Sequence, residues 1–300
     1  MKKLKKSQTL RAYLYSAPSL VLIGTIVLFP IIYTFYISLT DMSTYHWFDF
    51  DVIGFKHYGE AFSVLNGGFL TALLRTILWT VVNMATQLVI AYFIAVLLNR
   101  GKLKLKNVYK TILMFPWALP GYVSILLWKT GMFNTEFGLL NKWMTGLGLQ
   151  AVEWLSTNIS AFICCSVVNL WLALPFMIMI MDGALQSIDK SYYEYATLEG
   201  ANAFKKSWHI TLPMIRPIIG PAVIITVFTT FKQFDIIYLL TMQQGTGSDI
   251  QTVITYAYEN AFITNNYGYS SAISIIIFVM LTVFTMLFNR DMRATKKEGK

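Results

Sequence analysis

Four hydroxyl and amide side chains recur at helical spacing in an otherwise apolar stretch of the chain. They are Thr226, Thr229, Thr230 and Gln233, at i, i+3, i+4 and i+7, so a helix would place them on one face. These groups can donate and accept hydrogen bonds, as the hydroxyls of a sugar require. The face is expected either to line a cavity for a polar solute or to form hydrogen bonds with a neighbouring helix in a membrane.

Two charged residues, Lys232 and Asp235, lie three positions apart next to this polar face. Charged side chains inside an apolar segment are functional candidates because they are costly to bury in a membrane. Three interpretations stay open. The two side chains can pair for packing, Lys232 can extend to the outer surface, or the pair can relay a proton or contact an anionic solute.

The side chains needed for bond-making chemistry do not cluster in this sequence. His46, His57 and His209 are scattered, and the adjacent Cys164 and Cys165 lack the spacing of zinc ligands. The phosphate-binding pattern G-x-x-x-x-G-K-[ST] does not occur, so the chain is not expected to bind ATP in that way. We therefore expect no catalytic residue, no metal and no cofactor site, and we expect that the chain is not an enzyme.

The composition indicates that these residues are carried by membrane-spanning helices. Charged residues make up 13% of the 300 residues, about half of the roughly 25% usual for soluble domains. Runs of about 20 apolar residues are long enough to cross a bilayer. We therefore expect an all-α transmembrane fold in which a domain over 12–289 holds six spans, at approximately 12–38, 71–98, 108–129, 160–182, 217–240 and 270–289.

The cations predict the orientation of the spans. With a cytoplasmic N-terminus, 19 of the 24 Lys and Arg residues fall in the inside segments, which include the basic N-terminus 1–11 and the basic tail 290–300. This excess predicts that both termini are cytoplasmic. The formal net charge of +9 is dispersed and forms no continuous basic stripe, so membrane lipid and not nucleic acid is the expected partner.

One inside segment, 187–216, is too polar to span the membrane and is patterned as two short helices. Ser187 or Asp189 can cap the first helix, Gly200 permits a sharp turn, and Pro213 is expected to end the second. The aromatic residues of the segment need either a protein partner or the membrane surface to cover them.

The same segment resembles the EAA loop of binding-protein-dependent ABC importer permeases. Glu194-Tyr195-Ala196, three residues, Gly200, nine residues and Ile210-Thr211-Leu212-Pro213 match the spacing of that loop, with Tyr195 in place of an alanine. Finer motifs resemble the carbohydrate-uptake branch, of the maltose and glycerol-phosphate type. They are Gly54-Phe55-Lys56-His57-Tyr58, Gly138-Leu139-Leu140-Asn141, the run from Asn169 to Phe176, Ala184-Leu185-Gln186-Ser187-Ile188 and the run from Phe234 to Thr241. The Gly-Gly-Pro usual after the last run is replaced here by Met242-Gln243-Gln244-Gly245.

The resemblance implies a type I importer permease in the bacterial cytoplasmic (inner) membrane. The partners implied are a second homologous permease subunit, two ATP-binding subunits that carry ATP and Mg, an extracytoplasmic solute-binding protein and a sugar substrate. It implies a coupling contact with the ATP-binding subunit through Glu194, Tyr195, Ala196, Gly200, Ala203, Phe204, Ile210, Leu212 and Pro213. It implies a substrate cavity lined by Asn169, Leu172, Ala173, Phe176, Thr226, Thr229, Thr230 and Gln233.

An ion-coupled secondary transporter that works without an ATPase is the alternative. In that reading Lys232 and Asp235 form the relay. The EAA-like loop has no role in such a transporter, and no internal sequence repeat of the usual kind is evident.

Overall fold

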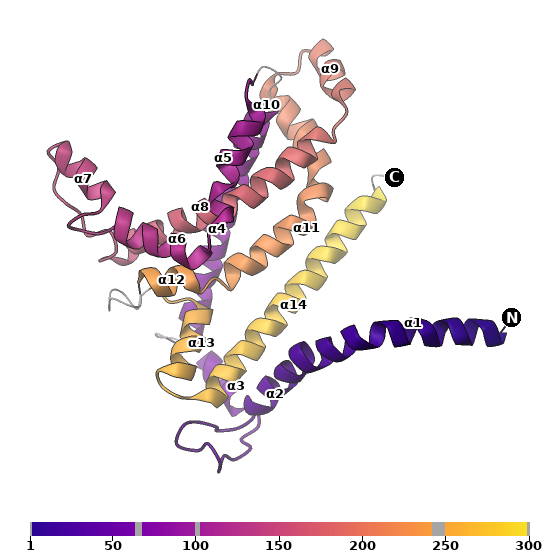
Figure 1. The fold of residues 1–300 in the computed structure, drawn as a ribbon, viewed down its shortest axis with the longest axis vertical. Coiled ribbons are helices and arrows are strands. Elements are labelled where there is room, and N and C mark those ends of the chain that lie inside the picture. Colours follow the sequence, from indigo (N-terminus) through magenta and orange to yellow (C-terminus); the bar gives the residue numbers. More distant parts are fainter. Residues whose placement is uncertain (1, 64–67, 100–102, 242–249, 299–300) are drawn as a thin grey trace. The chain divides into compact units, whose positions relative to one another are not determined.

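A computed structural model describes residues 2–63, 68–99, 103–241 and 250–298, so the predicted departure at Met242-Gln243-Gln244 lies outside the described residues. The described residues are almost entirely helical (Figure 1), and their only β pairing consists of two isolated bridges. The chain forms two compact units, residues 1–70 with 256–280 and residues 71–255 with 281–300. Each unit is described by itself.

The first unit contains the N-terminal helices and the beginning of the last helix. Its elements are α1 (Lys2–Ile23), a π-helical turn (Gly24–Leu28), α2 (Phe29–Ile37), α3 (Lys56–Ser63), most of α13 (Val253–Phe262) and the start of α14 (Tyr267–Glu298). Gly268 allows the backbones of this unit to approach closely, because a Cβ atom there would collide with the carbonyl oxygen of Thr40. The buried ring of His57 fixes the same loop, with its Nε2 atom 3.1 Å from the Thr40 oxygen.

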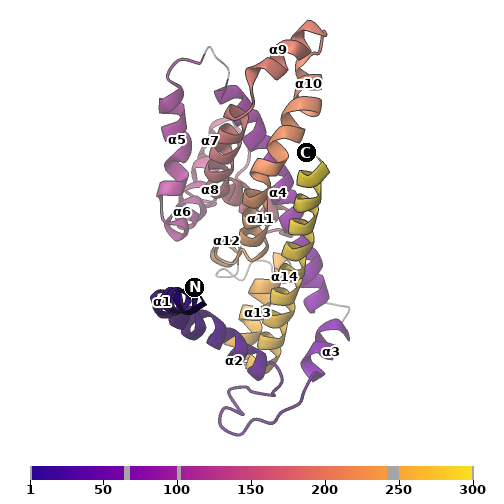
Figure 2. The ribbon, with the colours of Figure 1, turned by 90° about the vertical axis from the view of Figure 1, so that its right-hand side faces the viewer.

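The second unit contains the central helices, which Figure 2 shows from the side. Its elements are α4 (Phe69–Leu98), α5 (Lys106–Ala118), α6 (Gly121–Leu127), a π-helical turn (Trp128–Met132), α7 (Leu139–Gly146), α8 (Asn158–Gln186), α9 (Lys190–Leu198), α10 (Ala203–Lys206), a π-helical turn (Ser207–Thr211), α11 (Leu212–Phe231) and α12 (Asp235–Leu240).

Helix α8 is the centre of the second unit and packs against α5, α11 and α12. Trp79 of α4 lies in the core beside Cys164, Cys165 and Val168 of α8. Its indole Nε1 donates a hydrogen bond of 3.1 Å to the backbone oxygen of Thr230, so its polar group is satisfied within the core. This contact joins α4 to α11 at the depth of the predicted polar face.

The third apolar segment is bent. Helices α5 and α6 meet at an angle of 93°, with the break at Leu119 and Pro120. A residue before proline is pushed out of the helical region, and Leu119 is extended, with φ −89° and ψ 143°. The bend follows from this local rule, although the sequence prediction of one span over 108–129 did not indicate it.

The fifth apolar segment also differs from expectation, at both ends. Pro213 does not end a helix, because it lies in the first turn of α11 directly after the π-helical turn Ser207–Thr211. The wider bonding of a π turn accommodates a proline that would disrupt a regular α-helix. At the other end, α11 stops at Phe231 and α12 starts at Asp235, so the expectation that Gln233 shares the helix face of Thr226 is wrong.

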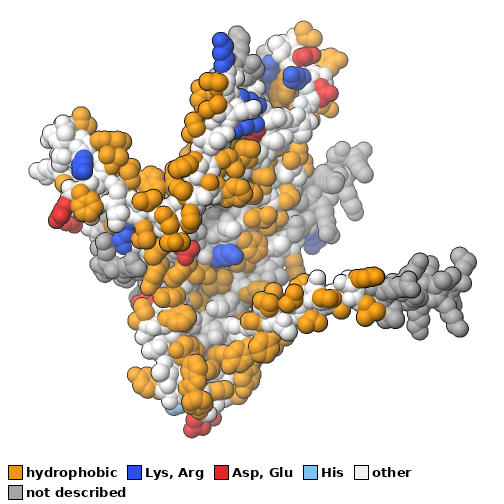
Figure 3. All heavy atoms as spheres, viewed as in Figure 1, with side chains coloured by type: hydrophobic (Ala, Val, Ile, Leu, Met, Phe, Trp, Pro, Cys, Tyr) orange, Lys and Arg blue, Asp and Glu red, His pale blue; other side chains and the backbone are white. Residues whose placement is uncertain are grey.

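Among the described residues, five helical segments are long and apolar enough to cross a membrane, and the bent pair α5–α6 with its π turn makes a sixth. The five are 13–37, 69–98, 158–186, 203–240 and 267–288. Apolar side chains are spread over much of the face shown in Figure 3, as expected for surfaces that meet lipid. The fold is therefore an all-α transmembrane fold.

Candidate functional site

The EAA-like segment forms two short helices joined by a sharp turn. Asp189 caps α9, because its Oδ1 accepts a hydrogen bond of 2.9 Å from the backbone N–H of Ser191, and this bond lowers the pKa of the carboxyl group. Gly200 has φ +75°, in the left-handed region that glycine adopts without strain. Asn202 caps α10 through a 2.9 Å bond from the Lys205 N–H to its Oδ1. The sequence thus builds a rigid helix, turn and helix.

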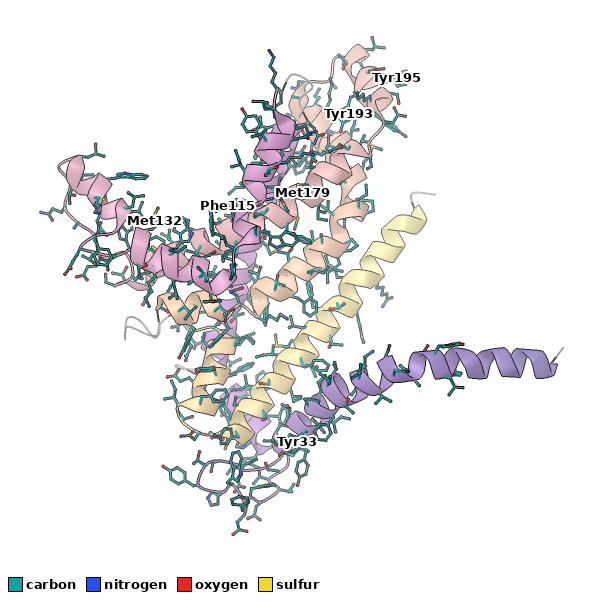
Figure 4. The ribbon with its side chains drawn as sticks, in the orientation of Figure 1. Tyr33, Phe115, Met132, Met179, Tyr193 and Tyr195 are labelled. Atoms are coloured by element: carbon teal, nitrogen blue, oxygen red, sulfur yellow. The ribbon has the colours of Figure 1, made fainter. Side chains whose placement is uncertain are left out.

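One face of this segment is apolar and exposed. Leu198 is 84% exposed and Phe204 74% exposed, and the rings of Phe204 and Trp208 stack with centroids 6.3 Å apart. Tyr195 lies on the outer side of α9 (Figure 4), where a tyrosine replaces the alanine usual in the resembling loop. Exposed apolar residues in such a group mark an interaction surface. We call Tyr192, Tyr195, Leu198, Phe204 and Trp208 the exposed face.

The opposite side of the segment is held together by internal hydrogen bonds and packs on neighbouring residues of the second unit. Tyr193, also labelled in Figure 4, has its hydroxyl 3.0 Å from Oγ1 of Thr211. Lys206 donates a hydrogen bond of 2.7 Å to Oγ1 of Thr197, so α10 is tied to α9. Tyr193 and Leu212 both pack against a buried cluster that contains Ile215. A force applied to the exposed face would therefore reach α11 through a connected set of contacts.

The residues expected to contact an ATP-binding subunit differ in their exposure. Six are exposed and three are half-buried. The exposed six are Glu194, Tyr195, Gly200, Ala203, Phe204 and Pro213, and the half-buried three are Ala196, Ile210 and Leu212. Trp208 and Leu198 belong to the same exposed face and were not among the expected contact residues.

The residues expected to line a cavity in α8 face neighbouring helices. Asn169 is buried, and its Nδ2 donates a hydrogen bond of 2.9 Å to Oδ1 of Asn83 in α4. The backbone oxygen of Ala173 accepts a 2.9 Å bond from Gln87 Nε2. Leu172 and Phe176 are half-buried. The contacts from Asn169 and Ala173 therefore join α8 to α4 in this conformation.

The expected polar face of α11 is only partly exposed. Thr226 and Thr230 are buried, Gln233 is half-buried, and Thr229 is exposed. The Thr226 hydroxyl donates to the Ala222 oxygen at 2.9 Å, and the Thr229 hydroxyl donates to the Thr226 oxygen at 3.0 Å. Each hydroxyl oxygen keeps acceptor capacity for a further hydrogen bond.

Lys232 and Asp235 stand at the break between α11 and α12, and both are exposed. The ion pairs found among the described residues do not include one between them. Pairing of the two side chains for packing is therefore not seen in this conformation.

Sequence reasoning missed a buried carboxylate near the end of α8. Asp182 is buried and forms an ion pair with Lys110 of α5, and its Oδ1 lies 3.8 Å from Lys106 Nζ. The amides of Asn99 and Gln186 donate to it at 2.8 and 2.7 Å. An acidic residue at the end of a long apolar run was the available signal, since such a residue needs a basic partner when buried. We call these five side chains the Asp182 network.

Comparison with known proteins places this arrangement in a family. Residues 87–291 match the family described as "Binding-protein-dependent transport system inner membrane component". The chain is 31% identical to the galactooligosaccharides transport system permease protein GanP of Bacillus subtilis, over 96% of this chain and 71% of that protein. It is 32% identical to the trehalose/maltose transport system permease protein MalF of Thermococcus litoralis, over 95% of both chains.

The fold has a solved counterpart. A chain of a bacterial ABC transporter involved in the import of the acidic polysaccharide alginate superposes with a TM-score of 0.81 at 21% identity, over 98% of each chain. The described helices therefore adopt the fold of an ABC importer permease. With its six apolar segments and its match over most of its length, the chain belongs to the family of inner-membrane components of binding-protein-dependent transport systems.

Proposed function

We propose that this chain is one permease subunit of an ATP-driven importer and forms half of the path by which a sugar or oligosaccharide crosses the membrane. The proposal is supported by the relatives, which are named for galactooligosaccharide and for trehalose/maltose transport. The same fold also occurs in an importer of an anionic sugar polymer, because the solved counterpart takes part in alginate import.

The proposed mechanism rests on the exposed face of the EAA-like segment. Five large apolar side chains are displayed on a rigid scaffold, and burying such surface is worth about 25 cal/mol per Å². We assign this face to an ATP-binding subunit, which would hold ATP and Mg. A second permease subunit and a second ATP-binding subunit complete the assembly, and a solute-binding protein docks at the opposite membrane surface. One solved relative is in complex with an alginate pentasaccharide-bound periplasmic protein.

Import would proceed by rigid-body motion. Closure of the ATP-binding subunits on ATP moves the exposed face, and the contacts of Tyr193, Lys206 and Leu212 carry the motion to α11. Rotation of α11 against α4 and α8 would uncover Asn169, Thr226 and Thr230 to solute. In the present conformation these three are buried.

Uptake in reconstituted vesicles tests this proposal against the ion-coupled alternative. The assembled transporter, with its solute-binding protein, should accumulate sugar when ATP is supplied on the side of the ATP-binding subunits and should be indifferent to ionophores. Uptake that collapses with the proton or sodium gradient and needs no ATP would overturn the proposal.

A further inference from the structure

A cavity of 590 Å³ lies between the EAA-like segment and the ends of the spans next to it. Its walls come from α4, α5, α8, α9, α10 and the π turn Ser207–Thr211. Part of the wall is apolar, with Val96 and Leu185, and part is basic, with Lys106, Lys190 and Lys206. Figure 1 locates α9 and α10, and Figure 3 shows that Lys and Arg side chains gather at the end of the second unit that carries these helices.

The basic wall keeps an excess of positive charge. Lys106 is partly neutralised, because its Nζ is 3.8 Å from the Asp182 carboxylate. That carboxylate is already occupied by Lys110 and by the amides of Asn99 and Gln186. Lys206 donates only to a neutral hydroxyl, and Lys190 is exposed. Asp189 lies beside Lys190 in sequence, but its carboxylate is directed to the N–H of Ser191.

The cavity wall also includes Tyr92, which is half-buried. Its hydroxyl oxygen is inaccessible to solvent and forms no hydrogen bond with any described residue, so a ligand in the cavity does not reach it in this conformation. The charged groups that the cavity offers to an anion are therefore its lysines.

We propose that this cavity binds a phosphate ester, held by Lys190 and Lys206, as a site separate from the transported solute. Lysine ammonium groups suit the compact charge of phosphate. The cavity is larger than inorganic phosphate, and its apolar wall can take the organic part of the ester. Basic pockets between helices at a membrane surface bind lipid headgroups in this manner, and a soluble sugar phosphate has the same chemistry.

The walls of the cavity come from both the EAA-like segment and the membrane-spanning helices. A bound ester would therefore contact both and hold them together. Lys190 and Lys206 lie on the segment, whereas Tyr92 and Val96 lie on α4. Occupancy would thus stabilise the position of the segment relative to α4.

The test is ligand-dependent thermal stability of the purified full chain in uncharged detergent, with two pairs of probes. Phosphatidylglycerol is compared with phosphatidylcholine, and glucose 6-phosphate is compared with glucose. We expect the anionic member of at least one pair to raise the unfolding midpoint above its counterpart. A rise with phosphatidylglycerol alone identifies a lipid source, and a rise with glucose 6-phosphate identifies a soluble one.

Variants locate the binding. The double variant Lys190→Gln with Lys206→Gln should raise the half-saturating concentration of the stabilising anion about tenfold or more. This change corresponds to a loss of about 1.4 kcal/mol of binding free energy. Lys190→Gln alone, at an exposed position of the cavity wall, should raise that concentration about two- to tenfold and guards against a double variant that fails to fold. The matched control is Lys104→Gln with Lys205→Gln, which removes the same charge from exposed lysines that do not line the cavity. No stabilisation by either anion, or equal loss in the control, would overturn the proposal.

Discussion

The Asp182 carboxylate shows how a single residue fixes the arrangement of three helices. It contacts Asn99 at the end of α4, Lys110 in α5 and Gln186 in its own helix α8. Desolvation of a carboxylate is costly, and the cost is offset only when several donors surround it. The network is therefore expected to specify how α5 lies against α8.

Replacement of Asp182 by Asn should destabilise the chain. The change removes the negative charge and leaves the partly buried ammonium of Lys110 without a counter-charge, at an expected cost of about 1–3 kcal/mol. The unfolding midpoint of the purified chain should fall. Asp189→Asn is the control, since asparagine caps a helix as well as aspartate. An unchanged midpoint in Asp182→Asn would refute a structural role for the network.

Thr229 is the member of the expected polar face that is exposed in this conformation, so it can be tested without disturbing packing. Thr229→Val keeps the shape and removes one hydroxyl. If that oxygen accepts a hydrogen bond from sugar, the KM of uptake should rise about two- to tenfold, because one such bond is worth about 0.5–1.5 kcal/mol. Thr25→Val, an exposed threonine of the first unit, is the control. Equal KM values in the two variants would remove Thr229 from the solute path.

At the scale of elements, the helices of the EAA-like segment could largely be predicted from the sequence. The residues that a solute would contact could not. The two short helices, the cap at Asp189 and the turn at Gly200 follow from local rules of capping and backbone freedom. The bend at Pro120 follows from the restriction of the residue before proline, whereas no local residue preference accounts for the break at Lys232. Apolar periodicity alone indicates that a segment is helical and does not show where it bends.

The polar residues show the same limit. A threonine or asparagine at helical spacing is predicted to avoid lipid, and Asn169 and Thr226 do so. Whether such a residue meets a solute or a neighbouring helix depends on partners far away in sequence. Asn83 is the partner of Asn169 here, and it lies 86 residues away. The contact of the expected cavity residues with a solute therefore stays a prediction.

The stacked pair Phe204 and Trp208 provides a test of the exposed face as an element. Trp208→Ser should weaken recovery of the ATP-binding subunit by about tenfold or more, because buried tryptophans dominate interface energies. Trp143→Ser is the control, since Trp143 is exposed at α7, away from the segment. The measurement is the yield of co-purified subunit at a series of salt concentrations. Full recovery with Trp208→Ser would place the interface elsewhere.

At the scale of the whole molecule, the cations predict the orientation in the membrane. We propose that both termini and the segment α9–α10 face the cytoplasm and that α7 faces outward. Single cysteines test this in a background where Cys164 and Cys165, both buried, are replaced by alanine. A membrane-impermeant maleimide should label Lys142→Cys in intact cells and Lys205→Cys only after permeabilisation. The reverse pattern would invert the proposed topology.

The central claim is that the segment α9–α10 joins this permease to an ATP-binding subunit. Its most direct measurement is purification through a tag on this chain, with mass spectrometry of the proteins recovered, for Gly200→Asp and for Gly148→Asp. Both glycines have left-handed φ, +75° and +78°, and open space at the Cβ position, so the two variants carry the same backbone strain. The account predicts that both variants stay in the membrane and that only Gly200→Asp loses the ATP-binding subunit. Recovery of that subunit with Gly200→Asp, at the level seen with Gly148→Asp, would contradict it.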